Sequence, residues 1–300
     1  MSNCSTTGPG ELAASFYADA ARQHRVTITE NVPLARDTWR VRFECPAIAR
    51  TVVPGQFLML RLPAGNDPLL ARPLALYDTV LDAKGQPTGV DVAYLVVGKM
   101  TARLSELRAG DELDVWGPLG NGFAAEPVDH LVMVAGGIGQ TPFLALGREY
   151  AGRRRYGNPP RSVVPAKAVT LCYGVRTVDY LAGEQDFAAA GVEVRVTSND
   201  GSVGRQGLVT AEVDAVLDEA AAAGHSVRLV CCGPEPMMEA VAELAAARQV
   251  ACQVSLETPM ACGIGACFSC VVKVRQPEGD WDYKRTCVEG PVFDAEKIVW

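Results

Sequence analysis

The stretch Cys262-Gly263-Ile264-Gly265-Ala266-Cys267-Phe268-Ser269-Cys270 places three cysteines in a C-x4-C-x2-C array, and Cys287 follows after sixteen further residues. This is the plant-type spacing for a 2Fe–2S cluster, which needs four thiolates around two irons. Gly263 and Gly265 favour the same interpretation, because a loop around a cluster brings backbone N–H groups close to inorganic sulfurs and glycine permits the required turns. We therefore predict four metal ligands: Cys262, Cys267, Cys270 and Cys287.

Two other interpretations of these cysteines remain open. A zinc site more often shows two C-x2-C pairs, and this chain has one. Four purely structural cysteines are the third alternative. The segment between Cys270 and Cys287 is shorter than in a plant-type ferredoxin, which indicates a small appended module over residues 251–300.

Composition excludes several classes of protein. A chain of 300 residues is too long for one ordinary core, so two or three domains are expected. The net charge of −7 argues against a nucleic-acid partner. No apolar run is long enough to span a membrane, and residues 1–10 do not resemble a secretory signal. We expect a cytoplasmic protein with an N-terminal extension over residues 1–24 and a weakly predicted helix over Glu11–Arg25.

Residues 25–126 consist of short alternating segments separated by turns rich in Pro, Gly and Asn, which predicts an antiparallel β-barrel. The expected strands are Arg25–Glu30, Thr38–Cys45, Phe57–Leu62, Val90–Val97 and Glu112–Trp116.

Residues 127–250 alternate between apolar strands and helical patterns, which predicts an α/β domain with a doubly wound parallel sheet. A helix is expected directly after the glycine loop that follows Leu131–Ala135. The other expected strands are Ala168–Tyr173, Val192–Thr197 and Val227–Cys232, and the other helices are Thr210–Ala223 and Pro236–Arg248. The basic, Pro-rich stretch Gly152–Pro165 is expected to be an exposed loop.

Two segments of the barrel are candidate phosphate sites. Arg72 precedes a proline, and a guanidinium fixed in this way suits a pyrophosphate. Thr101 is interpreted as the N-cap of a short helix, whose free N–H groups bind phosphate. A surface arginine at a strand end and a simple helix cap are the alternatives.

The α/β domain offers a second pair of candidate loops. Gly136-Gly137-Ile138-Gly139-Gln140-Thr141-Pro142 follows a strand, which suits a nucleotide phosphate. Cys232-Gly233-Pro234 ends a later strand. Both loops fall at the carboxyl edge of the sheet, where ligands bind in such folds. Loops of this kind also occur without a ligand, and Cys232 is alternatively a buried thiol.

Taken together, Arg72–Ala75, Gly98–Thr101, Gly117–Phe123, Gly136–Pro142 and Cys232–Met238 resemble the ferredoxin–NADP reductase superfamily. The cysteine stretch narrows the resemblance to the electron-transfer subunits of NAD-dependent dihydroorotate dehydrogenases. Two positions depart from the family: Ala75 stands where Ser or Gly is usual, and Met100 where Gly is frequent.

The resemblance implies FAD, NAD and a 2Fe–2S cluster as cofactors. It assigns FAD to Arg72, Pro73, Leu74, Ala75, Ala93, Tyr94, Leu95, Gly98, Met100 and Thr101. It assigns NAD to Gly136, Gly137, Gly139, Thr141, Pro142, Cys232, Gly233 and Pro234, with Cys232 also a candidate catalytic residue near the path of the hydride.

The resemblance also implies a function and a partner. The chain would be an oxidoreductase subunit in pyrimidine biosynthesis that passes electrons between NAD and a catalytic FMN subunit oxidising dihydroorotate, in a heterotetramer. Phe268, inside the ligand loop, is a candidate exposed anchor for that partner because aromatic residues are enriched at interface cores, and inward packing on its own module is the alternative. The alternatives are a hydrogenase or ferredoxin:NADP+ transhydrogenase subunit, a self-sufficient NADH:acceptor reductase, and a zinc-stabilised interaction protein. Asp200 favours NAD over NADP, while Arg176 and Arg205 leave the choice open.

Overall fold

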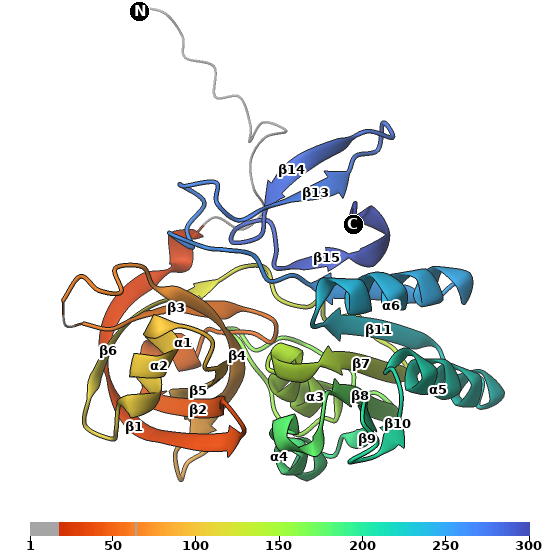
Figure 1. Cartoon of the computed structure of the whole chain (residues 1–300), viewed down its shortest axis with the longest axis horizontal. Coiled ribbons are helices and arrows are strands. Elements are labelled where there is room, and N and C mark those ends of the chain that lie inside the picture. The colour runs from red at the N-terminus through yellow and green to blue at the C-terminus, as the bar shows by residue number, and fades with distance from the viewer. Residues whose placement is uncertain (1–17, 64) are drawn as a thin grey trace, which may run out of the picture.

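The computed structural model describes residues 18–63 and 65–300, which form three parts (Figure 1). A closed barrel and an α/β domain lie side by side, and the C-terminal part lies above both. Of the expected helix over Glu11–Arg25, residues 11–17 lie outside the described residues and residues 18–25 lie among them. Within them it is replaced by a short 3-10 turn at Ala18–Ala20 and by the start of β1.

The barrel contains six antiparallel strands in the order β1-β2-β5-β4-β3-β6. Strand β1 is long and pairs with β6 through its first half and with β2 through its second half, which closes the barrel. Because this strand begins at Arg22, the barrel takes up the last residues of the expected extension. The strands are β1 (Arg22–Ala35), β2 (Thr38–Glu44), β3 (Phe57–Arg61), β4 (Arg72–Leu81), β5 (Pro87–Leu95) and β6 (Glu112–Leu119).

Strand β4 was not among the expected strands. Its burial pattern does not alternate, because the four consecutive residues Leu76–Thr79 are all buried. A strand covered on both faces loses the period of two on which the prediction relied. Two short helices, α1 (Pro46–Ala49) and α2 (Lys99–Glu106), complete the barrel.

The α/β domain has a seven-stranded sheet in the order β10-β9-β8-β7-β11-β12-β15. All of its strand pairs are parallel except that of β12 with β15. The strands are β7 (His130–Gly136), β8 (Ala168–Val175), β9 (Glu193–Ser198), β10 (Arg205–Gln206), β11 (Val227–Cys232), β12 (Ala251–Ser255) and β15 (Val292–Asp294). The helices are α3 (Phe143–Tyr150), α4 (Glu184–Ala189), α5 (Thr210–Ala222) and α6 (Glu235–Ala247).

The basic stretch Gly152–Pro165 is a loop and most of its residues are exposed, as predicted, but Arg154, Tyr156 and Arg161 contact the rest of the protein. Tyr156 is 3% exposed and its hydroxyl donates a hydrogen bond to Asp78 Oδ1, at 2.6 Å. Arg154 also bonds Asp78, and Arg161 pairs with the buried Glu149. Arg154 and Tyr156 therefore tie this loop to Asp78 of the barrel strand β4, whereas Arg161 ties it to α3 of the α/β domain.

The C-terminal part does not begin as a separate module. Strand β12 pairs with β11, and β15 continues the same sheet, so the first strand beyond residue 250 lies in the nucleotide-domain sheet. Between them runs the cysteine loop, followed by the hairpin of β13 (Val271–Arg275) and β14 (Trp281–Arg285). No helix in the described ranges is long and apolar enough to cross a membrane.

Candidate functional site

The four predicted cysteine ligands come together in two pairs. Cys270 and Cys287 have their Sγ atoms 3.3 Å apart, and the thiols of Cys262 and Cys267 also hydrogen-bond each other. Within residues 18–63 and 65–300, no group of three or more His, Cys, Asp or Glu converges on a single point that could hold one metal ion. Two pairs of thiols suit two irons better than one tetrahedral zinc.

The barrel supports the cysteine loop. Cys270 and Cys287 are each 1% exposed and pack in a cluster with Phe57, Met59 and Leu119 of β3 and β6. The indole Nε1 of Trp116 donates a hydrogen bond to the Cys262 carbonyl oxygen, at 3.2 Å. Gly263 has φ +73°, and a side chain there would place its Cβ 2.6 Å from Met59 Cγ. The glycine is therefore required both by its turn and by close packing.

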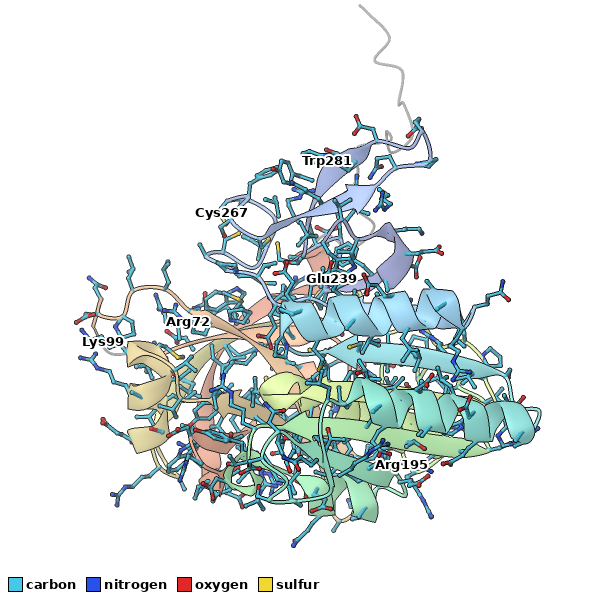
Figure 2. All side chains as sticks on the ribbon, turned by 45° about the vertical axis from the view of Figure 1, so that its right-hand side comes forward. Arg72, Lys99, Arg195, Glu239, Cys267 and Trp281 are labelled. Carbon is cyan, nitrogen blue, oxygen red and sulfur yellow. The ribbon has the colours of Figure 1, made fainter. Side chains whose placement is uncertain are left out.

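The outer half of the loop is exposed. Cys267 lies at the surface, and Figure 2 shows it on the projecting loop with Trp281 on the hairpin beyond it. A hydrogen bond from the Ser269 hydroxyl lowers the pKa of Cys267 to about 6. In the inner pair, the bond from Cys287 lowers the pKa of Cys270 to about 6 and raises that of Cys287. These hydrogen bonds lower the pKa values of Cys267 and Cys270. A lower pKa favours the thiolate, the form of cysteine that binds iron.

A single cavity of about 760 Å³ lies between the barrel, the α/β domain and the cysteine loop. All ten predicted FAD residues line it: Arg72, Pro73, Leu74, Ala75, Ala93, Tyr94, Leu95, Gly98, Met100 and Thr101. Of the predicted NAD residues, Thr141, Pro142 and Cys232 line it as well. The opposite wall contains Thr258–Ala261 and Ser269 of the cysteine loop, which places this loop directly against the cavity.

The predicted role of Thr101 as a helix N-cap is wrong. Helix α2 begins at Lys99 with Gly98 as its N-cap, and Thr101 stands in its first turn. The Thr101 hydroxyl accepts hydrogen bonds from the backbone N–H groups of Val97, at 3.1 Å, and Gly98, at 3.2 Å. The position works as the second half of a capping box, which fixes the entry of the chain into the helix at the cavity wall.

The glycine loop after β7 differs from the prediction in two ways. A 3-10 turn at Gly137–Gln140 precedes α3, so the helix starts later than expected. A Cβ on Gly139 would lie 2.2 Å from the Cys232 carbonyl oxygen, so this glycine packs the loop against the end of β11. Gly136 and Gly233 likewise pack against each other and against Met237 and Pro234. Among the glycines of these two loops, Gly137 is the one with open space where a Cβ would lie, and its φ is +54°. A ligand could therefore approach the backbone closely there.

A pair of polar side chains accompanies Cys232 at the carboxyl ends of β11 and β12. Ser255 hydrogen-bonds the Cys232 thiol, and the Glu257 carboxyl lies close enough to raise its pKa further. Burial is the main cause of the high pKa of Cys232. All three residues line the cavity. The sequence analysis gave Ser255 and Glu257 no role as site residues, because their proximity to Cys232 arises from the pairing of β11 with β12.

The edge that was expected to hold the adenosine end of the nucleotide is polar. Asp200 follows β9, and its Oδ1 accepts hydrogen bonds from the Ser202 backbone N–H, at 3.0 Å, and hydroxyl, at 2.7 Å. Arg205 is paired with Glu212 at 3.3 Å. Of the two basic residues that left NADP open, Arg205 is therefore already in an ion pair with Glu212, whereas Arg176 is exposed.

Comparison with known proteins gives three successive family matches along the chain. Residues 25–123 match an oxidoreductase FAD-binding domain and residues 133–243 an oxidoreductase NAD-binding domain. Residues 257–299 match the iron–sulfur cluster binding domain of dihydroorotate dehydrogenase B. The dihydroorotate dehydrogenase B (NAD(+)) electron transfer subunit of Desulforamulus reducens is 36% identical over 89% of this chain and 94% of its own length. The chain belongs to this family of electron transfer subunits.

Other relatives agree. The subunit of the same name from Geobacillus kaustophilus is 37% identical, over 92% of this chain and 98% of its own. Among solved structures, an NADH-dependent reduced ferredoxin–NADP oxidoreductase superposes with a TM-score of 0.73 at 28% identity, covering 92% of this chain and 90% of its own. The cytochrome b5 reductase domain of Ulva prolifera nitrate reductase has the same fold, with a TM-score of 0.53 at 19% identity over 76% of this chain and 92% of its own.

The residues of this electron transfer subunit fit the three groups that its domains bind. The cysteines supply four soft thiolates in two pairs for the cluster. The large cavity, mostly apolar and with Arg72 at its wall, suits FAD. The chain is thus an oxidoreductase subunit that acts with a catalytic partner, as the name of its relatives states.

Proposed function

We propose that this chain passes electrons between NAD and an FMN-containing subunit that oxidises dihydroorotate, through its 2Fe–2S cluster and FAD. Relatives named as electron transfer subunits of NAD-dependent dihydroorotate dehydrogenase B support the reaction. The FMN of the partner, the heterotetramer and the cytoplasmic location remain predictions.

One observation carries the proposal: Cys232 and Ser269 both line the cavity assigned to FAD. The Ser269 hydroxyl lies 3.2 Å from Cys267 Sγ, so the wall of the cavity touches a cluster ligand. Bound FAD takes or gives electrons in pairs as hydride and singly with a cluster, which is the chemistry that a relay between NAD and a 2Fe–2S centre requires.

The residues of the chain then bind and orient. Arg72 suits the pyrophosphate of FAD, and Thr101 fixes the start of α2 at the same wall. Gly137 leaves room for a nucleotide at the carboxyl edge of the sheet. Cys232, 2% exposed, gives the cavity a small apolar surface there, where the nicotinamide would approach.

The test is a reconstitution with the dihydroorotate-oxidising subunit of the same organism. Orotate formation that depends on NAD+ is expected in the mixture and in neither subunit alone. Reduction of NAD+ by the isolated catalytic subunit, or failure of the two chains to associate, would contradict the proposal.

A ferredoxin:NADP+ type of reductase is the second candidate, because such an enzyme gives a TM-score of 0.73 over most of the chain. A cysteine at position 262 argues against it, because the resemblance implies that an aspartate often takes this place in that type. Reduction of ferredoxin by the FAD-loaded and cluster-loaded chain, without the dihydroorotate-oxidising subunit, would favour the second candidate.

A further inference from the structure

Glu257 is a carboxyl without a partner in the wall of the FAD cavity. In the described part of the chain, no salt bridge or hydrogen bond engages its carboxylate. The residue is exposed because it faces the open cavity, yet the protein around it raises the pKa of its carboxyl, with burial as the cause. Carboxyls held in this way are candidates for proton transfer.

The other titratable groups of the cavity wall do not compete for this role. Across the described residues these are Arg72 of β4, Tyr94 of β5 and Cys232 of β11. Arg72 stays charged and its Nη1 donates to the Leu70 and Ala71 carbonyl oxygens. The Tyr94 hydroxyl donates to Asn31 Oδ1, at 3.0 Å, and burial raises the pKa values of both Tyr94 and Cys232. Glu257 is the one carboxylic acid among them, and burial raises the pKa of its carboxyl.

Reduction of NAD+ by electrons from the cluster needs a proton donor near the flavin. Electrons that cross the cysteine loop singly carry no proton, whereas the hydride that leaves on NADH is two electrons and one proton. Each NAD+ reduced therefore consumes one proton that must reach the flavin from elsewhere. Glu257 lies near Cys232, at the ends of β11 and β12 and at the edge where nucleotides bind in such sheets.

We propose that the Glu257 carboxyl supplies this proton when NAD+ is reduced and takes it back in the reverse direction. The O–H bond of Glu257 breaks, and its proton joins the flavin together with two electrons from the cluster. NAD+ then takes the two electrons and the proton from the reduced flavin as a hydride and leaves as NADH. Solvent then reprotonates the carboxylate. This inference rests on the proposed electron path.

The design of the test follows from the balance of protons. A hydride from NADH brings its own proton, so reduction of bound FAD by NADH does not need the Glu257 carboxyl as an acid. Reduction of NAD+ driven by reduced methyl viologen, a one-electron donor without a proton, does need it. The two reactions are compared by rapid mixing without oxygen, in the chain loaded with FAD and cluster.

Glu257→Gln is expected to slow NADH formation from methyl viologen at least tenfold and to change reduction of FAD by NADH less than twofold. Glu257→Asp should recover part of the rate. The matched control is Glu239→Gln, on the exposed side of α6 away from the cavity (Figure 2), which should change neither reaction. A pH-indicator dye should also report slower proton uptake when FAD in the Glu257→Gln variant is reduced without NAD+.

In the wild type, the viologen-driven rate should fall with rising pH, and in Glu257→Gln it should be independent of pH. Equal effects on both reactions, or no effect on either, would overturn the role of Glu257, provided that the flavin absorbance shows full occupancy. A loss of the viologen-driven rate in Cys232→Ala but not in Glu257→Gln would assign the proton to the thiol instead. If wild-type FAD is not reduced by NADH at all, the proposed function fails and not this inference.

Discussion

Cys270 Sγ and Cys287 Sγ lie 3.3 Å apart, although the two residues are 17 positions apart in the sequence. The hairpin between them explains the contact. Val271, next to Cys270, pairs with Arg285, and the backbone N–H of Thr286, next to Cys287, donates a hydrogen bond to the Cys270 carbonyl oxygen at 2.8 Å. The short segment between Cys270 and Cys287, which distinguishes this chain from a plant-type ferredoxin, is thus a β-hairpin that brings the fourth predicted ligand next to the third.

Replacing any one of Cys262, Cys267, Cys270 and Cys287 with Ser is expected to bleach the cluster absorbance and to leave FAD bound. The reason is that the thiolates hold the irons, whereas the cavity for FAD is formed largely by the barrel. Iron and sulfide analysis with a visible spectrum checks this. Cys252→Ser, on β12, is the control and should keep the cluster; full iron content in Cys287→Ser would instead make Cys252 a candidate ligand.

Arg72→Ala is expected to weaken flavin binding roughly ten- to a hundredfold, since hydrogen bonds to charged groups are worth about 1.5–3 kcal/mol. Flavin occupancy after gel filtration measures the effect, with the exposed Arg50→Ala as control. The flavin released by heat should be FAD, because only a dinucleotide offers the pyrophosphate that Arg72 suits. Released FMN would contradict the assignment.

Bound FAD is expected to be reduced faster by NADH than by NADPH. The carboxylate of Asp200 disfavours a 2′-phosphate, and Arg205 is already paired with Glu212. Asp200→Ala should reduce the preference for NADH about tenfold, as measured by stopped-flow absorbance. A wild-type chain that prefers NADPH would show that Arg176 and not Asp200 decides the choice.

Arg161→Met is expected to destabilise the protein by about 3 kcal/mol, because it leaves a buried carboxylate without its partner. Glu149 is 1% and Arg161 16% exposed at the side chain, and Arg161 Nε donates to Glu149 Oε1 at 3.2 Å. Thermal unfolding measures the change. The double variant Arg161→Met with Glu149→Met should recover most of the loss, whereas equal losses in both would place the effect elsewhere.

Phe268→Asp is expected to weaken association with the catalytic subunit at least tenfold while the cluster remains. Phe268 is 62% exposed with φ +57°, and the Arg285 guanidinium lies 4.9 Å from its ring centre. Aromatic residues at interface centres carry much of the binding energy. Association is measured by light scattering and cluster content by absorbance; Trp281→Asp, on the hairpin, tests whether the interface extends that far. Unchanged affinity in Phe268→Asp would exclude the loop from the interface.

Local patterns in the sequence were sufficient to predict much of the fold and of the candidate site. The cysteine spacing predicted the ligands, which the fold brings together in pairs, and the family match confirms an iron–sulfur domain. The barrel strands were predicted from alternating segments, whereas β7, β8 and β11 of the parallel sheet, buried along most of their length, were predicted from apolar runs. Arg72 and Cys232, far apart in the sequence, were both assigned to cofactors, and both line the same cavity.

Contacts between distant segments decided the rest. Strand β4 is covered on both faces, so its sequence has no period to read. The basic loop around Arg161 is fixed by Glu149 and Asp78, which no local pattern links to it. Glu257 was given no role from the sequence, and the pairing of β11 with β12 brings it near Cys232. The sequence alone determined which groups can bind iron and nucleotides, because that depends on residue type and spacing. That the Glu257 carboxyl lies beside these groups without a partner depends on the packing of distant segments, which exists only in the folded chain.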